Sequence, residues 1–392
     1  MMATRLLIVD DSALMRRHLS NLFEGEGSYD VRCARNGVEA VLAVREFVPD
    51  VVTLDINMPE MDGLTALAHI MQERPTPVVM VSSLTEQGAL ATFEALALGA
   101  VDYVAKPGGT ISLSLDEVAP VLLSKVKAAS RARIRRGVAA PSGARPARAE
   151  RQAAPDTAPA PVNAPAETCV QPSAARARAV QQSTVPVAGT QPRPSLSGVV
   201  LIGVSTGGPG TLEGILPQLP ADFPYPVIVA QHMPAAFTGP FARRLDAICP
   251  LNVTEAGAPQ EVVPGNIYIA RGSADTVLTT RAGKLTVLAR PETQGHLWHP
   301  SVELLARTAL EQCQPRQLIG VMLTGMGYDG AEAFCDLRRL GGRTIAESEE
   351  TAVVYGMPKA LIDRDGATMV LPAQGIARQL NAWAYGDLHG IH

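Results

Sequence analysis

The stretch RLLIVDDSALMRRHLSNLF, residues 5–23, carries the pattern that decides the fold of the first part of the chain. An apolar run at 6–9 leads into two aspartates, and the segment that follows has apolar residues at helical spacing from 12 to 23. Ser12 is expected to cap this helix. Further apolar runs come at 29–33, 51–54, 77–81 and 100–104, with a second amphipathic segment at 86–98 that Gly99 is expected to end. This alternation predicts a parallel sheet with helices on both faces.

The composition limits the classes of protein that fit. A chain of 392 residues with 46% hydrophobic residues is long enough for two cores. A net charge of -4 argues against a protein that wraps nucleic acid. No apolar stretch is long enough for a membrane span, and two acids interrupt the start of the chain before a signal peptide could form. We therefore expect a cytoplasmic protein that is not inserted into a membrane, with reduced thiols at its scattered cysteines, Cys33, Cys169, Cys249, Cys313 and Cys335.

A change of composition divides the chain. Residues 131–195 are rich in Ala, Pro and Arg and contain no aromatic residue and no Leu, so they cannot form a core. Their ten arginines against three acids make this segment basic and leave the rest of the chain acidic. We expect a solvated, flexible tether. The predicted organisation is a first domain at 1–125, a linker at 126–195, a second domain at 196–385 and a tail at 386–392.

Charged and polar residues follow the strands of the first domain. Asp10 and Asp11 come directly after the first strand and Asp55 after the third, so a parallel sheet brings three carboxylates to one edge. A divalent cation such as Mg²⁺ would relieve their repulsion. Ser82 and Lys106, at the ends of two further strands, suit a phosphoryl group on Asp55.

The motifs LIVDDSALMRR (7–17), LDINMPEMDGL (54–64), VMVSSLTE (79–86) and VDYVAKP (101–107) resemble the receiver domain of bacterial response regulators. The resemblance implies a flavodoxin-like, doubly wound, five-stranded parallel sheet. It also implies a role for each site residue: Asp55 as phosphoacceptor, Asp10, Asp11, Asp55 and Asn57 as Mg²⁺ ligands (Asn57 through its backbone carbonyl), Ser82 and Tyr103 as switch residues, and Lys106 as the phosphate-binding cation.

The second segment opens with an apolar run at 198–204 and continues as GVSTGGPGTLEGIL, 203–216. Small residues on both sides of Ser205 fit a sharp strand-to-helix turn that exposes a nucleophile, with the helix N-terminus facing a developing oxyanion. Glycine-rich turns also cradle phosphates, although this one has neither the spacing nor the lysine of a P-loop.

A serine nucleophile requires a base, and histidine is the usual one. His232 follows the apolar run 226–230 and is the preferred candidate, with His299 of the stretch GHLWHPSVELL second. The orienting acid is sought in Asp329, which glycines flank after the run 318–323. Capping of the following helix is the alternative role for Asp329. The order Ser, His, Asp disfavours an α/β-hydrolase fold but not triad chemistry.

The motifs VSTGGP, VAQHMP, FTGPFARRLD, PGNIYIA, HPSVELL, LTGMGYDGA and VVYGMPKAL resemble the catalytic domain of the chemotaxis protein-glutamate methylesterase family, CheB. The resemblance implies a second doubly wound, mostly parallel α/β domain with hydrolytic activity. It assigns Ser205 as nucleophile, His232 as base, Asp329 as orienting acid, and the backbone amides of Thr206 and Met326 as the oxyanion site. The stretches ARGSADTVL (270–278) and AESEETAVV (346–354) depart from the family pattern, and the linker is longer than usual.

The combined resemblance implies a phosphorylation-activated methylesterase that releases methanol from methylated chemoreceptors, also deamidates receptor glutamines, and receives its phosphoryl group from a chemotaxis histidine kinase. Mg²⁺ is expected in the receiver and no cofactor in the esterase site. The main alternative is a non-enzymatic response regulator that binds a nucleotide or protein partner through the turn at 206–210. A DNA-binding output domain is less consistent with a long α/β segment.

Overall fold

A computed structural model of the chain describes residues 3–83, 85–106, 111–132 and 196–389. The described residues before and after the long gap belong to one compact unit. The predicted tether therefore lies almost entirely outside the described residues. No helix among the described residues is both long and apolar enough to cross a membrane.

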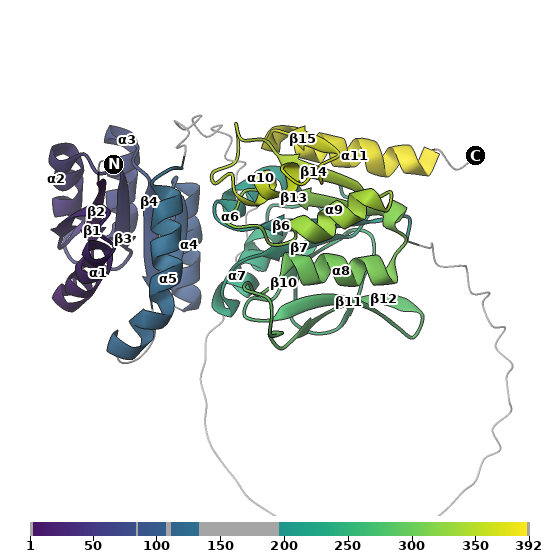
Figure 1. Cartoon of the computed structure of the whole chain (residues 1–392), viewed down its shortest axis with the longest axis horizontal. Coiled ribbons are helices and arrows are strands. Elements are labelled where there is room, and N and C mark those ends of the chain that lie inside the picture. Colours follow the sequence, from purple (N-terminus) through teal and green to yellow (C-terminus); the bar gives the residue numbers. More distant parts are fainter. Residues whose placement is uncertain (1–2, 84, 107–110, 133–195, 390–392) are drawn as a thin grey trace, which may run out of the picture. The chain divides into compact units, whose positions relative to one another are not determined.

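The first segment is the predicted five-stranded parallel sheet, with strand order β2-β1-β3-β4-β5 (Figure 1). This is the order of flavodoxin-like folds. Its elements in chain order are β1 (Thr4–Val9), α1 (Ala13–Gly25), β2 (Tyr29–Ala34), α2 (Gly37–Phe47), β3 (Val51–Asp55), α3 (Gly63–Glu73), β4 (Val78–Ser83), α4 (Glu86–Ala97), β5 (Asp102–Lys106) and α5 (Ile111–Ala129).

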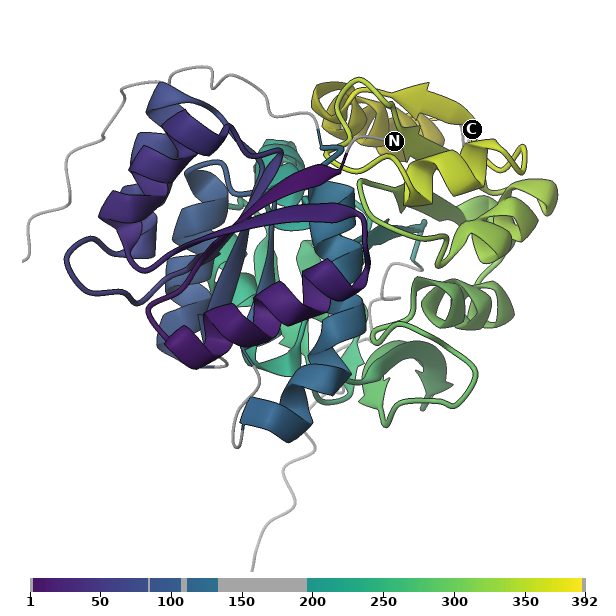
Figure 2. The same cartoon turned by 60° about the vertical axis from the view of Figure 1, so that its left-hand side comes forward.

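Alternating side chains of the strands bury opposite faces of this sheet. Leu6 and Ile8 pack with α1 and α5, whereas Leu7 and Val9 pack with α2, α3 and α4. Figure 2 shows α1 crossing in front of the sheet. The Ser12 side chain accepts the Met15 N–H at the start of α1, as predicted.

Two boundaries differ from the prediction. Helix α5 continues to Ala129, and Val126 and Ala129 are fully buried in the core of the first segment. The first domain therefore extends beyond residue 125, because this last turn completes the cover of the sheet. Likewise α11 continues to His389, past the expected domain end at 385.

The second segment contains a seven-stranded parallel sheet of order β15-β14-β13-β6-β7-β10-β8. Its elements are β6 (Val199–Val204), α6 (Gly208–Ile215), η1 (Leu216–Gln218), β7 (Val227–Gln231), α7 (Ala235–Asp246), β8 (Asn252–Ala256), β9 (Gln260–Glu261), β10 (Asn266–Ala270), β11 (Asp275–Arg281), β12 (Lys284–Arg290), α8 (Val302–Gln312), η2 (Pro315–Gln317), β13 (Leu318–Met322), α9 (Ala331–Arg339), β14 (Arg343–Glu347), α10 (Met357–Ile362), β15 (Met369–Leu371) and α11 (Ala373–His389).

Two helical layers cover the second sheet. Side chains of α6, α7 and α11 pack on the face that contains Val200 and Ile202, and side chains of α8, α9 and α10 pack on the face that contains Val199 and Leu201. A small antiparallel sheet of order β11-β12-β9 joins the second layer. The sequence analysis did not predict this sheet. The central strands β6, β7 and β13 are completely buried, so their C-terminal ends form a stable edge on which a site can be built.

Candidate active site

Three acids and one lysine meet at the edge of the first sheet. Carboxylate oxygens of Asp10, Asp11 and Asp55 all lie within 4.8 Å of one another. The Lys106 Nζ atom lies 3.0 Å from Asp10 Oδ2 and 2.7 Å from Asp55 Oδ2. The sequence prediction that these residues converge is thus confirmed by their geometry.

The environment of this cluster perturbs two of its groups. Burial, together with the nearby charge of Asp10, raises the pKa of Asp55 although Lys106 opposes the shift. Burial acts against the charge on Lys106, but Asp55 and Asp10 outweigh it and raise the pKa of the lysine. The Asp55 side chain is only 4% exposed and that of Lys106 is 23% exposed, so the carboxylate bears more of the desolvation penalty. A hard divalent cation suits such a set of oxygen donors.

Of the other predicted receiver residues, Asn57 contacts this cluster directly. The Asn57 backbone N–H approaches Asp55 Oδ1 at 3.4 Å. Ser82 is buried and its hydroxyl donates to the Gly88 carbonyl at 3.1 Å. Tyr103 is 3% exposed, so its ring lies inside rather than in solvent.

Ser205 directly follows β6 and precedes the N-terminus of α6. The turn requires glycine at two positions: Gly207 has a φ of 78°, and a Cβ on Gly208 would lie 2.0 Å from Gln231 Oε1. The Ser205 N–H donates to the Thr324 carbonyl at 2.9 Å, which ties the turn to the end of β13. The predicted strand-to-helix turn is present, but it is not exposed in this structure, because Ser205 is buried at 9% exposure and Thr206 at 1%.

His232 lies next to Ser205 because β6 and β7 run in parallel register, with Val204 opposite Gln231. The His232 N–H donates to the Val204 carbonyl at 3.1 Å. Its Nε2 atom lies 2.9 Å from Asp329 Oδ2, and its Nδ1 atom is buried without a hydrogen-bond partner among the described residues. Nδ1 is thus the nitrogen left for a serine proton. No hydrogen bond joins the Ser205 hydroxyl to His232 or to another described residue.

Asp329 accepts four hydrogen bonds. His232 Nε2 and the Val302 N–H meet its Oδ2 at 2.9 and 2.7 Å, and the Ser301 hydroxyl and the Glu303 N–H meet its Oδ1 at 3.1 Å each. Burial alone would raise the pKa of Asp329, but these bonds and the charge of His232 lower it below the ordinary value. The carboxylate is therefore held ionised beside the His232 imidazole.

The alternative role for Asp329, capping of the helix that follows it, is not observed. The residue before α9 is Gly330, with a φ of 82° and no side-chain cap. Asp329 instead accepts N–H groups at the start of α8, where the helix dipole favours a negative charge. His299, the second candidate base, is bound through Nδ1 to Asp275 Oδ1 at 2.7 Å and so belongs to a different pair.

A hydrogen-bond network connects the Ser205 turn to the loop after β13. The Thr324 hydroxyl donates to the Thr206 carbonyl at 2.8 Å and accepts the Val354 N–H at 2.9 Å. The Thr324 N–H donates to Oε2 of the fully buried Glu347 at 2.8 Å. Among the described residues, no hydrogen bond from the backbone N–H of Thr206 or Met326 is found. Both predicted oxyanion donors therefore lack a partner among the described residues, as a site that donates to a developing oxyanion requires.

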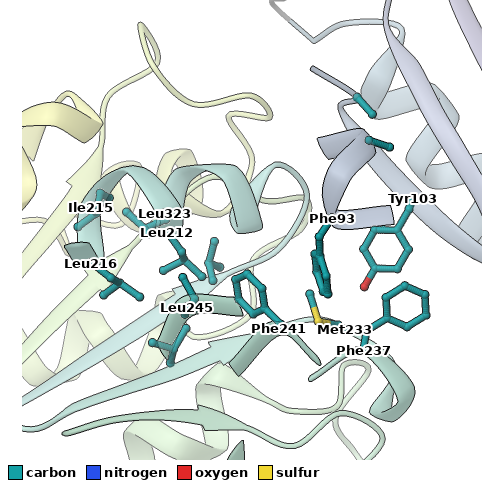
Figure 3. Close-up of a cluster of buried hydrophobic side chains, with 14 of the residues drawn as sticks. Phe93, Tyr103, Leu212, Ile215, Leu216, Met233, Phe237, Phe241, Leu245 and Leu323 are labelled. Atoms are coloured by element: carbon teal, nitrogen blue, oxygen red, sulfur yellow. The ribbon is translucent and has the colours of Figure 1, made fainter. Parts of the chain in front are cut away.

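The first segment contacts the second beside this site. Phe93 of α4 stacks on Phe241 of α7 with ring centroids 5.3 Å apart, and Tyr103 of β5 stacks on Phe237 of α7 at 4.6 Å. Figure 3 shows these rings converging near Met233. α7 begins three residues after His232, so the contact reaches the helix next to that histidine.

A second contact involves α5. The Ser124 hydroxyl lies 3.0 Å from the Met326 sulfur, and Val353 packs against the first-segment core formed with α1 and α5. Tyr103 and Met326 were singled out from the sequence for other roles, but neither was predicted to join the two segments, and Phe93, Ser124, Phe237, Phe241 and Val353 were not predicted at all. Aromatic residues at 237 and 241, one helical turn apart, were the available signal.

Known proteins resemble this chain over nearly its whole length. A family model described as CheB methylesterase matches residues 200–380, and one described as response regulator receiver domain matches residues 6–114. A protein-glutamate methylesterase/protein-glutamine glutaminase of Rhodospirillum rubrum is 53% identical over 97% of this chain and 96% of its own length. A second, from Rhodopseudomonas palustris, is 50% identical over 98% of this chain and 99% of its own length. The crystal structure of the Thermotoga maritima CheB methylesterase catalytic domain is 41% identical, covers 47% of this chain and 97% of that domain, and has a TM-score of 0.45.

Proposed function

This chain belongs to the CheB methylesterase family, and from that premise we propose how its residues carry out and regulate the reaction. It is a protein-glutamate methylesterase and protein-glutamine glutaminase of the chemotaxis type, joined to a receiver domain. The domains are the receiver, the Ala/Pro/Arg-rich linker and the methylesterase domain. Ser205 is the nucleophile, His232 the general base and acid, and Asp329 the acid that orients the imidazole.

The first half of the reaction forms an acyl-enzyme. His232 Nδ1 takes the proton of the Ser205 hydroxyl while Oγ attacks the carbonyl carbon of the glutamate methyl ester. The backbone amides of Thr206 and Met326 donate to the resulting oxyanion. The imidazolium then returns its proton to the departing methoxide, so methanol leaves and the acyl-serine remains.

Water completes the cycle. His232 removes a proton from the attacking water, and the acyl bond to Ser205 breaks with return of that proton to Oγ; the glutamic acid side chain that is released then loses its remaining proton to solvent. A glutamine follows the same path with ammonia in place of methanol. The observation that carries this assignment is the His232–Asp329 pair, 2.9 Å apart beside the Ser205 turn.

The receiver supplies the control. Asp55 accepts a phosphoryl group from a chemotaxis histidine kinase. Asp10, Asp11, Asp55 and the Asn57 carbonyl would hold Mg²⁺, which would supply positive charge to the phosphoryl oxygens. Lys106 binds the phosphoryl group, and Ser82 and Tyr103 change position with it. The Ser82 hydroxyl now donates to Gly88 rather than toward Asp55, so it must rotate to reach a phosphoryl oxygen.

The unphosphorylated receiver limits access to the site. Ser124 touches Met326, whose amide is one of the two oxyanion donors, and Tyr103 stacks on α7 beside His232. Rotation of Tyr103 would remove its stacking on Phe237. Phosphorylation thereby weakens the contact and opens the site.

We infer that the substrates are methylated chemoreceptors and that the enzyme and its kinase act in the cytoplasm. A purely binding role for the second domain would not require the His232–Asp329 pair. The test is methanol release from methylated chemoreceptor membranes by the full chain, compared with Ser205→Ala. Activity that persists in a folded Ser205→Ala variant would contradict the assignment.

A further inference from the structure

We propose that Trp298 is a positioning residue of the hydrolytic site, which holds the His232 imidazole by stacking on its face. The inference rests on the proposed function, because it concerns how the base of that reaction is held. Trp298 lies in the stretch 291–300 between β12 and α8, which the proposed mechanism does not otherwise use.

The ring geometry carries the inference. The Trp298 and His232 rings are almost parallel, with an interplanar angle of 3° and centroids 5.7 Å apart. Tyr328 meets Trp298 edge-on at 5.4 Å and 89°, from the residue directly before Asp329. A Cβ on Gly327, which has a φ of 85°, would lie 2.8 Å from the Trp298 ring. Trp298 is therefore in close contact with both the base and the loop that contains Met326.

The segment that bears Trp298 is fixed at both ends. Asp275 on β11 is fully buried, and its two carboxylate oxygens accept the Thr293 N–H and pair with His299 Nδ1, each at 2.7 Å. At the other end the Ser301 side chain caps α8, and its hydroxyl contacts both His296 Nδ1 and Asp329 Oδ1. These anchors lie on either side of Trp298 and hold it without using the His232 hydrogen bond.

Stacking of Trp298 on His232 restricts a rotation of the imidazole that its hydrogen bond to Asp329 leaves free. One hydrogen bond at Nε2 sets the position of one imidazole atom but allows the ring to tilt, which would move Nδ1 away from Ser205. An aromatic face against the ring restricts that tilt. It also attracts the imidazolium that forms during acylation, because a cation near an aromatic face within about 6 Å is stabilised.

The expected size of the effect is modest and specific. A cation–π contribution of this kind corresponds to a change in rate of about 2-fold to 30-fold. Because the imidazolium exists in the transition state and not in the bound ester, the change should fall on kcat rather than on KM.

The matched variants are Trp298→Phe and Trp298→Leu in the full chain. Both are apolar side chains that fill part of the indole volume, but only phenylalanine keeps an aromatic face. Leu297→Ala is the control, because Leu297 is the adjacent residue and is 75% exposed. Thermal unfolding of each protein shows whether it is folded.

Methanol release is measured as a function of substrate, with Mg²⁺ and acetyl phosphate present, on membranes of methylated chemoreceptors. We expect Trp298→Leu to lower kcat about tenfold at nearly unchanged KM, Trp298→Phe to stay within about threefold of wild type, and Leu297→Ala to match wild-type kcat. The labelling rate of Ser205 by a fluorophosphonate should follow the same order.

Two results overturn the inference: equal kcat for the Phe and Leu variants, or a loss in Trp298→Leu that appears only in KM. Failure of the proposed function is a separate result, because in that case the wild-type chain itself would release no methanol.

Discussion

Replacement of Asp329 by asparagine tests both the Ser205–His232–Asp329 triad and the hydrogen bonds that hold Asp329 in place. In the wild-type protein the two carboxylate oxygens accept bonds from His232, Ser301, Val302 and Glu303. An asparagine has only one oxygen, so its NH₂ group must face one of two backbone N–H donors, at Val302 or at Glu303. The buried donor left unsatisfied should cost about 1–3 kcal/mol of unfolding free energy.

The effect on catalysis should be much larger than the effect on stability. Asp329→Asn removes the negative charge beside the imidazolium and favours the wrong tautomer of His232, so kcat should fall by about 10²–10⁴. The assay is methanol release at saturating substrate, with thermal unfolding measured in parallel. Ser301→Ala is the graded comparison: it removes one neutral bond to the carboxylate together with the α8 cap and the His296 contact, so it should lower stability but lower kcat far less than Asp329→Asn does.

The pH dependence has a defined sign. The pKa of Asp329 lies below its ordinary value of 3.8 in the folded protein, so its contribution to stability is fully present above about pH 4 and is lost as pH falls through the folded pKa. Asp329→Asn should lack this part of the acid unfolding curve. A folded Asp329→Asn protein with kcat within about threefold of wild type would refute the triad assignment.

Three further predictions concern other parts of the molecule. Glu347→Leu removes the acceptor of the Thr324 N–H and should lower kcat about tenfold or more, whereas Glu347→Gln retains an acceptor and should keep kcat within about threefold of wild type. Equal losses of kcat in the two variants would contradict the role of Glu347 in holding the loop that contains Thr324. Mg²⁺ at ten times its dissociation constant should raise the unfolding free energy of the wild-type protein by about 1.4 kcal/mol, and the same concentration should raise that of Asp55→Asn by less. Equal increases in the two proteins, measured by calorimetry, would contradict a metal site at Asp55. Phe237→Ala should raise the unphosphorylated methanol-release rate about 2-fold to 10-fold relative to the phosphorylated rate, because it removes stacking on Tyr103; an unchanged ratio would show that this contact does not limit access.

The sequence predicted those parts of the site that depend on local pattern. Asp55 and Ser205 lie at or just beyond the ends of predicted strands, and parallel pairing alone brings them to the sheet edges. His232 follows for the same reason, since its strand pairs with that of Ser205. The sheet order was also predictable, because the resemblance to receiver domains covered nearly the whole first segment.

What the sequence did not predict depends on tertiary contacts. Asp329 accepts the N–H of Val302, 27 residues earlier in the chain, at the start of α8. No local pattern distinguishes this contact from capping of α9, the helix that directly follows Asp329. Trp298 reaches His232 from a loop whose course is set by Asp275, on a strand of the small antiparallel sheet that was not predicted. The Phe237 contact depends on how two separately predicted segments pack, which neither segment's pattern contains.

The most direct test of the account is methanol release from methylated chemoreceptor membranes by wild type, Ser205→Ala and Asp55→Asn, each with and without acetyl phosphate and Mg²⁺. The account predicts release that disappears in Ser205→Ala and that rises with acetyl phosphate in wild type but not in Asp55→Asn. Release that is independent of Ser205, or an equal response to acetyl phosphate in Asp55→Asn, would contradict it.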